Sequence, residues 1–293
     1  MKNIQLKFTV IFFLLIITTT LSAQEFQGKA TYQTKTTLNM DFANSGIPAD
    51  RIKMIKERMK SRLERTYVLT FNKTASIYKE EAKLDQSAGS RGGMRFMMMG
   101  GGASGNHYKN TQTKGSSKEN EFSGKNFLIK DDLITYDWKM EQETKIIGEY
   151  TCYKATAVVE RPMRREIQFG RRNNTEEDRE EQEKKEKEQE NIMELIIVTA
   201  WYTLDIPVNN GPGDYWGLPG LILEISDDNT QILCTKIIMN PKEKMELKEP
   251  TKGKVVTQKE YDLIFEEKTK EMRERMQNER KKSGRPGHIR IRG

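Results

Sequence analysis

One short stretch, residues 211–225 with the sequence GPGDYWGLPGLILEI, constrains the fold of this chain more than any other. Its first ten residues include four glycines and two prolines, namely Gly211, Pro212, Gly213, Gly217, Pro219 and Gly220. Glycine permits positive φ angles and proline fixes φ near about −65°, so this composition predicts a shaped turn. Tyr215 and Trp216 at its centre supply a large amphipathic surface that a flexible linker does not need. We therefore expect a rigid, largely buried turn, in which a positive φ at Gly220 would disfavour a β-branched residue.

The letters of this turn also carry a family resemblance. GLPGLILE at residues 217–224, IIVTAWYTLDIPVNNGPGDYW at 196–216 and IGEYTCYKATAV at 147–158 resemble the GLPGLI family of exported, Bacteroidetes-type bacterial proteins. The resemblance extends over most of residues 26–241. It implies an exported protein of a family without a settled biochemical activity, and therefore names no reaction.

The first 23 residues have the pattern of a cleaved secretory signal peptide. Lys2 and Lys7 precede an apolar run at 8–17, and small residues end the segment at Ala23. The apolar run is too short for a stable bilayer-spanning helix. Gln24 and not cysteine would follow the cleavage, so no lipid anchor is expected. These features predict a periplasmic or secreted protein.

Two cysteines, Cys152 and Cys234, are present in the whole chain. An oxidising compartment favours their pairing, so we expect a disulfide between them. The alternative is a pair of buried free thiols.

Short strand patterns separated by polar turns follow one another along residues 24–250. They occur at residues 26–38, 66–71, 75–78, 108–113, 125–129, 133–138, 145–147, 151–159, 195–203, 221–226 and 230–239. The alternation of Tyr67, Leu69 and Phe71 predicts one buried face on the second of these strands, and residues 72–73 are expected to form the turn of a hairpin with the third. Such spacing is typical of antiparallel sheets and not of βαβ units. We therefore predict a mainly β (β-rich α+β) domain at 24–250, with about ten strands in a strongly curved sheet or incomplete barrel and flanking helices.

Two segments show helical periodicity. Residues 51–65 form a basic helix whose apolar stripe consists of Ile52, Ile55, Met59 and Leu63. We expect this helix to cap the sheet; the alternative is a helix on a membrane surface, because its polar face is almost wholly basic. Residues 251–283 predict a second helix, whose first half should dock on the sheet through a stripe of Tyr261, Ile264, Phe265, Met272 and Met276. A basic, disordered tail at 284–293 is expected to follow.

Two low-complexity insertions interrupt the strand patterns. Residues 83–106 are rich in Gly, Met and Ser, and residues 161–191 contain the run TEEDREEQEKKEKEQE, with nine acidic against four basic residues. Neither segment has the apolar periodicity that offsets the entropy of ordering. Both are expected to be dispensable for folding.

The residue inventory excludes several kinds of catalytic site. His107 and His288 are the only histidines, so no HExxH motif, Ser-His-Asp triad or His₃ zinc site is expected. The glycines of 211–217 lack the dinucleotide-binding spacing and lead into a strand, so no nucleotide cofactor is expected. Asp205, Asp214 and Glu224 could in principle serve glycoside hydrolysis. However, Glu224 alternates with apolar neighbours and is expected to face solvent.

A soft-metal site is the remaining chemical alternative. Met94, Met97, Met98 and Met99 are thioethers that could hold Cu(I), with His107 nearby. The competing interpretation is a weakly apolar loop, since flexible Met residues also suit adaptable contacts.

The partner class follows from charge and compartment. The chain carries a formal net charge of +7. Aromatic residues do not interleave with the Lys/Arg runs, so nucleic acid is not expected. An anionic membrane surface is the more suitable polyanion for an exported protein.

Two hypotheses on function remain from different classes. In the first, a non-enzymatic envelope protein binds an apolar ligand or a hydrophobic partner segment, and Tyr215, Trp216 and Leu218 form the lip of the site. In the second, a structural or interaction protein accessory to an outer-membrane assembly has no ligand pocket, and the turn only braces the sheet. A hydrolase using the acidic residues near the turn is a third alternative. An apolar cavity lined by strands supports the first hypothesis, and a filled interior with a buried Trp216 supports the second.

Overall fold

A computed structural model describes residues 26–37, 40–42, 46–81, 104–162, 167–168, 193–243 and 245–282. The predicted signal peptide at 1–23 and the basic tail at 284–293 lie outside these residues. So do the parts of the two predicted insertions at 83–103, 163–166 and 169–191.

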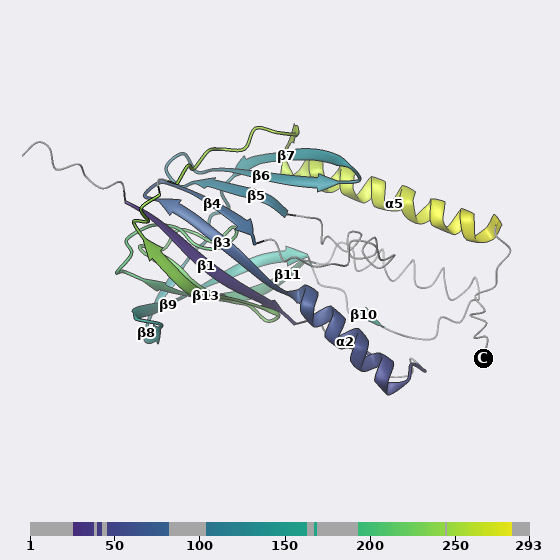
Figure 1. Ribbon diagram of the computed structural model, residues 1–293, viewed down its shortest axis with the longest axis horizontal. Helices are drawn as coiled ribbons and strands as arrows, with labels where there is room; N and C mark the ends of the chain where they lie inside the picture. Colours follow the sequence, from purple (N-terminus) through teal and green to yellow (C-terminus); the bar gives the residue numbers. More distant parts are fainter. Residues whose placement is uncertain are drawn as a thin grey trace, which may run out of the picture.

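The described chain is mainly β and is built on one twisted 12-stranded sheet (Figure 1). In spatial order the strands are β14 (Lys254–Val256), β7 (Lys125–Asp132), β6 (Gly115–Phe122), β5 (Ser104–Asn110), β4 (Ala75–Glu80), β3 (Glu64–Asn72), β1 (Gln27–Thr36), β13 (Thr230–Met239), β12 (Leu221–Ser226), β11 (Met193–Thr203), β9 (Tyr150–Pro162) and β8 (Lys139–Ile147). All neighbouring strands are antiparallel except β14 and β7, which are parallel. The sheet does not close into a barrel, which confirms the predicted fold class. A separate parallel pair joins β2 (Met40–Asp41) and β10 (Ile167–Gln168).

Two of the strand connections mark the two opposite ends of the sheet. At one end lies the connection from β11 to β12, residues 204–220, which we call the GLPGLI loop. At the other end, helix α2 (Ala49–Leu63) connects β1 to β3, and we call this the α2 end. Strand register places the beginning of β11 at the α2 end, because Thr199 of β11 lies opposite Ser226, the last residue of β12.

The predicted hairpin around residues 72–73 is present between β3 and β4. The side-chain oxygen of Asn72 accepts hydrogen bonds from the backbone N–H groups of Thr74 at 2.9 Å and Ala75 at 2.7 Å. Asn fixes tight turns in this way because its short side chain imitates a backbone acceptor. The alternation expected along β3 is also observed, since Leu69 and Phe71 are fully buried.

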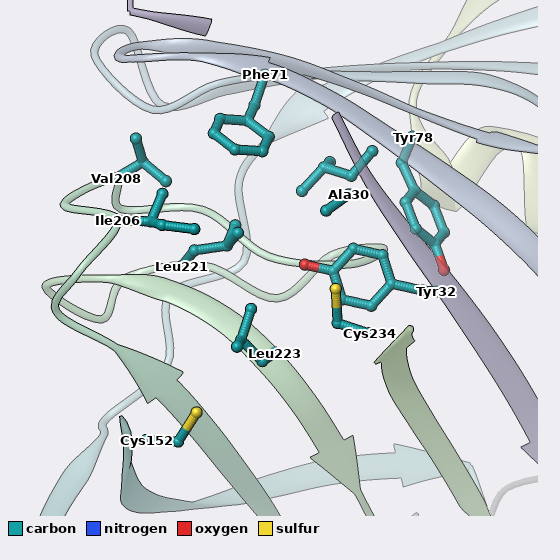
Figure 2. Close-up of a cluster of buried hydrophobic side chains, with 11 residues drawn as sticks. Ala30, Tyr32, Phe71, Tyr78, Cys152, Ile206, Val208, Leu221, Leu223 and Cys234 are labelled. Carbon is teal, nitrogen blue, oxygen red and sulfur yellow. The ribbon is translucent and has the colours of Figure 1, made fainter. Parts of the chain in front are cut away.

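Large side chains fill the interior of the curved sheet (Figure 2). The cluster contains Ala30, Tyr32, Leu69, Phe71, Tyr78, Ile206, Val208, Leu221 and Leu223, together with both cysteines. Tyr32 is fully buried, and its hydroxyl donates to the carbonyl oxygen of Ile222 at 2.7 Å. A buried hydroxyl needs such a partner to offset its desolvation. The core is therefore packed from strands on both halves of the sheet.

The predicted disulfide is absent, because Cys152 and Cys234 are both buried free thiols. Cys152 lies on β9 and Cys234 on β13, and two strands, β12 and β11, separate them in the sheet. At a strand spacing of about 4.8 Å, this places the two backbones roughly 14 Å apart along the sheet, whereas a disulfide needs Cα atoms within about 7 Å. The strand order, which cysteine counting does not provide, excludes the bond.

Helix α5 (Gln258–Lys282) docks its first turns on β7, as the apolar stripe predicted. The ring of Tyr261 lies 5.4 Å from that of Phe127, and the ring of Phe265 lies 4.6 Å from that of Phe122. The helix begins with a capping box, in which Glu260 accepts from the backbone N–H of Thr257 at 2.8 Å and its own N–H donates to the Thr257 hydroxyl at 3.2 Å. Neither α2 nor α5 combines the length and hydropathy needed to cross a bilayer.

Several strand assignments differ from the sequence expectation, and the short strands β2, β10 and β14 were not predicted. Residues 133–138 were expected to form a strand but run as an irregular connection between β7 and β8. Conversely, β6 was not expected, because its sequence GSSKENEF has no apolar alternation. It pairs on both sides, with β5 and β7, and tertiary pairing therefore overrides its weak local preference.

Candidate functional site

The GLPGLI loop lies against one face of strands β9, β11 and β12. Leu218 is fully buried there, in a second core cluster that also contains Ala155, Ile196, Val198, Ala200, Tyr202, Ile222 and Ile225. The strands beneath the loop are thus covered on both faces, since Leu221 and Leu223 point into the first cluster. This explains why five successive residues of β12 are buried.

Two tryptophans join the loop to the connection 133–138. The indole N–H of Trp216 donates to the carbonyl oxygen of Ile134 at 2.6 Å, and the indole N–H of Trp138 donates to the carbonyl oxygen of Trp216 at 2.8 Å. Tyr136 lies between Ile134 and Trp138 in sequence, and its ring contacts the rings of Trp138 at 5.2 Å and Tyr215 at 5.4 Å. Trp216 is only 7% exposed. Burial of Trp216 and Leu218 fits a brace and not the lip of a binding site; Tyr215 is half-buried.

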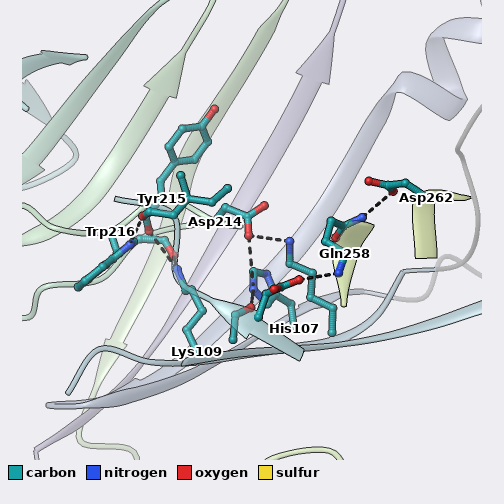
Figure 3. Close-up of polar contacts among 12 residues, drawn as sticks. His107, Lys109, Asp214, Tyr215, Trp216, Gln258 and Asp262 are labelled. Atoms are coloured by element: carbon teal, nitrogen blue, oxygen red, sulfur yellow. Dashed lines mark hydrogen bonds and ion pairs between the residues drawn. The ribbon is translucent and has the colours of Figure 1, made fainter. Parts of the chain in front are cut away.

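A buried lysine holds the loop from the other half of the sheet (Figure 3). Lys109 on β5 is fully buried, and its ammonium donates to the carbonyl oxygens of Gly211 at 2.7 Å and Tyr215 at 3.0 Å. Burial lowers the pKa of Lys109 to about 7. One strand further, the Ser76 hydroxyl of β4 donates to the side-chain oxygen of Asn210 at 3.1 Å.

Three glycines permit the path of the loop. Gly213 and Gly217 have φ angles of +55° and +104°, which L-residues rarely adopt. Glycine is required at position 220 for a different reason from the one expected, because the φ angle of Gly220 is not positive. A Cβ atom at this position would lie 1.8 Å from the carbonyl oxygen of Thr203. Glycine is required there because two backbones approach closely.

The loop therefore connects parts of the sheet that are not neighbours. Its polar contacts reach β4 and β5, while its apolar side chains pack on β9, β11 and β12. In the sheet order, β3, β1 and β13 lie between these two groups of strands. Because the sheet is not closed by strand pairing, the GLPGLI loop braces it from one half to the other.

Where the loop meets β5 and β6, four polar residues form a compact cluster: His107, Ser116, Lys118 and Asp214 (Figure 3). The Asp214 carboxylate lies 2.8 Å from the Lys118 ammonium and 3.6 Å from Nε2 of His107. Burial raises the pKa of Asp214, but the charge of the Lys118 ammonium and its hydrogen bond to the carboxylate outweigh this effect, so the pKa lies below its ordinary value. Burial lowers the pKa of His107 to about 3, which keeps the imidazole neutral near pH 7.

This cluster has the residue types of a Ser-His-Asp triad but not its geometry. Nε2 of His107 lies 3.0 Å from the Ser116 hydroxyl oxygen and is also the atom that faces Asp214. A working triad uses one ring nitrogen for the serine and the other for the carboxylate. A general base also needs a pKa near the working pH, which the buried imidazole lacks. The cluster thus anchors Asp214 of the loop to β5 and β6.

The three acidic residues proposed for hydrolysis meet different partners. Asp205 accepts from the Thr203 hydroxyl at 3.2 Å, Asp214 pairs with Lys118, and Glu224 pairs with Lys145 at 2.6 Å. No arrangement of two free carboxylates around a common point follows from these contacts.

The expectation that Glu224 faces solvent is wrong, since it is 8% exposed. A β-bulge is the reason: Trp201 lies opposite Glu224 and Tyr202 lies opposite Ile222, which leaves Leu223 as the extra residue. The bulge shifts the alternation by one position. Glu224 consequently lies on the same side as Trp201, whose ring also contacts the Lys145 ammonium at 4.3 Å.

Metal binding finds no support among the described residues, which contain no cluster of three or more His, Cys, Asp or Glu side chains suited to an ion. Met94, Met97, Met98 and Met99 lie outside the described residues, so the copper alternative stays a prediction. His107, its proposed fifth ligand, is buried with Nε2 engaged by Ser116.

A groove of about 570 Å³ runs between α5 and the end of β7, next to Asp214. Carboxylates and aliphatic side chains share its lining, among them Ile129, Asp131, Leu133, Asp214, Asp262 and Leu263. Part of the polar lining is already engaged, since Asp131 accepts from the backbone N–H of Gln258 at 2.5 Å. It is not the apolar cavity, lined by inward strand residues, that the ligand hypothesis requires.

Several residues that hold the loop were not identified from the sequence. Lys109 belongs to a strand about one hundred positions away and resembles any surface lysine in the sequence. Tyr136 and Trp138 were assigned to a strand; their aromatic spacing was the available signal for a contact with Tyr215 and Trp216.

Comparisons with known proteins are informative for part of the chain. A family model described as "Protein of unknown function (Porph_ging)" matches residues 138–224, which include β9, β11 and the GLPGLI loop. No curated protein matches the sequence. Two solved structures of PNGF-II, in the C2 and P21 space groups, are similar over 82% of this chain, with a TM-score of 0.46 and 13% identity. The chain spans 32% and 33% of those two solved chains.

Proposed function

We propose that the protein is an exported, non-enzymatic interaction protein of the cell envelope, in which the GLPGLI loop braces the sheet and binds no ligand. The observation that supports this proposal most is the filled interior of the sheet: Tyr32, Phe71 and Leu221 are fully buried, and Trp216 is a core residue. A sheet that held an apolar ligand would leave part of this space open. The second of the two hypotheses is therefore the better supported.

The chemistry of the polar residues also favours a non-enzymatic role. His107 is neutral and buried, and Asp214 and Glu224 are each neutralised by a lysine. Groups used in acid–base catalysis are instead poised for proton transfer close to the substrate.

An interaction role is supported by apolar side chains that the fold leaves uncovered. Leu195, Ile197 and Val158 are 74%, 62% and 57% exposed on neighbouring strands. Contiguous exposed apolar residues commonly mark interaction sites. Export, the signal peptide, the GLPGLI-family membership and the link to an outer-membrane assembly belong to this proposal and rest on the sequence.

Native mass spectrometry of protein purified from its own envelope and washed at high salt tests the proposal. We expect the mass of the chain beginning at Gln24, alone or with a protein partner. A stoichiometric small apolar molecule that survives the salt wash would contradict it and restore the ligand hypothesis.

A further inference from the structure

Strands β9 and β11 extend past their neighbours at the α2 end. β12 pairs with β11 only as far as Thr199, and β8 pairs with β9 only as far as Thr156. Residues 157–162 and 193–198 therefore pair with each other alone, and we call this two-stranded extension the β9–β11 arm.

The two faces of the arm differ in burial. Ile196 and Val198 are buried in the second core cluster. On the opposite face, Leu195 and Ile197 are exposed, and Val158, the direct cross-strand neighbour of Ile197, is exposed beside them. The packed face holds the arm in place, so the exposed face, which is apolar apart from Glu160 opposite Leu195, lies on a fixed support.

A basic helix lies at the same end. Helix α2 has six basic and two acidic residues, and Arg51, Lys53, Lys56 and Lys60 are exposed. The helix follows β1, whose last residue Thr36 lies opposite Thr230 at the beginning of β13.

The helix is only partly covered by the sheet. Figure 1 shows α2 continuing beyond the ends of β1 and β3. Its expected capping role is accordingly limited: Ile52 and Ile55 are half-buried, and Met54 is 60% exposed. The ammonium of Lys60 lies 4.0 Å from the carboxylate of Glu64. Both side chains are exposed, so this ion pair neutralises little of the charge of α2.

We infer that the α2 end of the sheet docks on an anionic lipid surface, with the lysines of α2 over the headgroups and the apolar face of the β9–β11 arm in the interface. A bilayer with anionic lipids offers both chemistries in one partner, namely negative charge at the surface and an apolar layer beneath it. The inference rests on the proposed interaction role and names its partner. A protein partner would need a separate acidic patch and apolar groove to match the two elements.

Sedimentation with vesicles tests the inference on the purified chain beginning at Gln24. We expect binding to vesicles of phosphatidylglycerol and phosphatidylcholine, and binding weaker by at least about tenfold to pure phosphatidylcholine or at high salt, because screening removes the charge attraction. Equal binding to both kinds of vesicle, or none to either, would overturn the inference.

Matched variants locate the surface. K53E/K56E/K60E should abolish binding, whereas K29E/K73E/K242E, with the same charge change on exposed lysines at the opposite end, should leave it unchanged. L195S/I197S should weaken binding while keeping the salt dependence. Equal losses in both lysine variants would overturn the assignment to α2, and full binding by L195S/I197S would overturn the role of the arm.

A second copy of the chain is the competing occupant of the arm. A dimer in sedimentation velocity that L195S/I197S abolishes, without vesicle binding, would overturn the lipid inference. Unfolding curves of each variant establish that it is folded. A tightly bound internal ligand would instead contradict the proposed function and leave the vesicle result unaffected.

Discussion

Trp138 and Trp216 hold each other's segments in place: the Trp138 indole donates to the Trp216 carbonyl oxygen at 2.8 Å, across 78 residues of sequence. The Trp216 indole in turn donates to the carbonyl oxygen of Ile134. Each indole N–H thus has a backbone carbonyl of the other segment as its acceptor. A buried indole N–H is costly without such a partner, so the two segments stabilise each other.

Gly220→Ala should lower the free energy of unfolding by several kcal/mol, because its Cβ would lie 1.8 Å from the Thr203 carbonyl oxygen and one backbone must move. Urea unfolding measures the change. Gly115→Ala is the matched control, since a Cβ atom there would meet only the side-chain oxygen of Thr113, at an ordinary contact distance of 3.6 Å. Similar stability of the two variants would contradict the close approach.

Stability should fall as the pH falls from about 6.5 towards 3, because of His107. Burial lowers the pKa of His107 to about 3 in the folded chain from its ordinary value of 6.5, so between these two pH values the unfolded state binds the additional proton. The free energy of unfolding should decrease by about 1.4 kcal/mol per pH unit from this group at full effect. His107→Gln should show a shallower decrease in urea unfolding between pH 6.5 and 4. Identical slopes for the variant and the unmodified chain would count against a neutral, buried imidazole.

Both cysteines should be unreactive thiols in the folded protein. Burial raises the pKa of Cys152 to about 11 and that of Cys234 to about 12, so neither is a thiolate at neutral pH. We expect no reaction with a thiol reagent until urea is added, and then two equivalents. A mass two hydrogens lower in the unreduced protein would show the disulfide that the strand order excludes.

The sequence was sufficient for the fold class and for the nature of the loop. Alternation along β3, the turn at Asn72 and the stripe of α5 each reflect local chemistry, and each appears where it was expected. The composition of 211–220 likewise predicted a shaped, buried turn, because Gly and Pro act through local backbone geometry.

The misses concern properties that depend on strand order and register. The bulge at Leu223 places Glu224 on the other face of the sheet from the one that alternation predicts, and no local sequence pattern indicates this bulge. Cysteine pairing fails because two strands intervene between β9 and β13. Lys109 was overlooked since its partners are backbone carbonyls of a distant loop.

Trp216→Ala tests the brace most directly, through the free energy of unfolding in urea. We predict a loss of about 3–5 kcal/mol, because a buried indole leaves a cavity and the Ile134 carbonyl loses its partner. Trp216→Phe keeps most of the ring and should lose less. An unchanged free energy of unfolding in Trp216→Ala would contradict the brace and return the GLPGLI loop to the role of a binding lip.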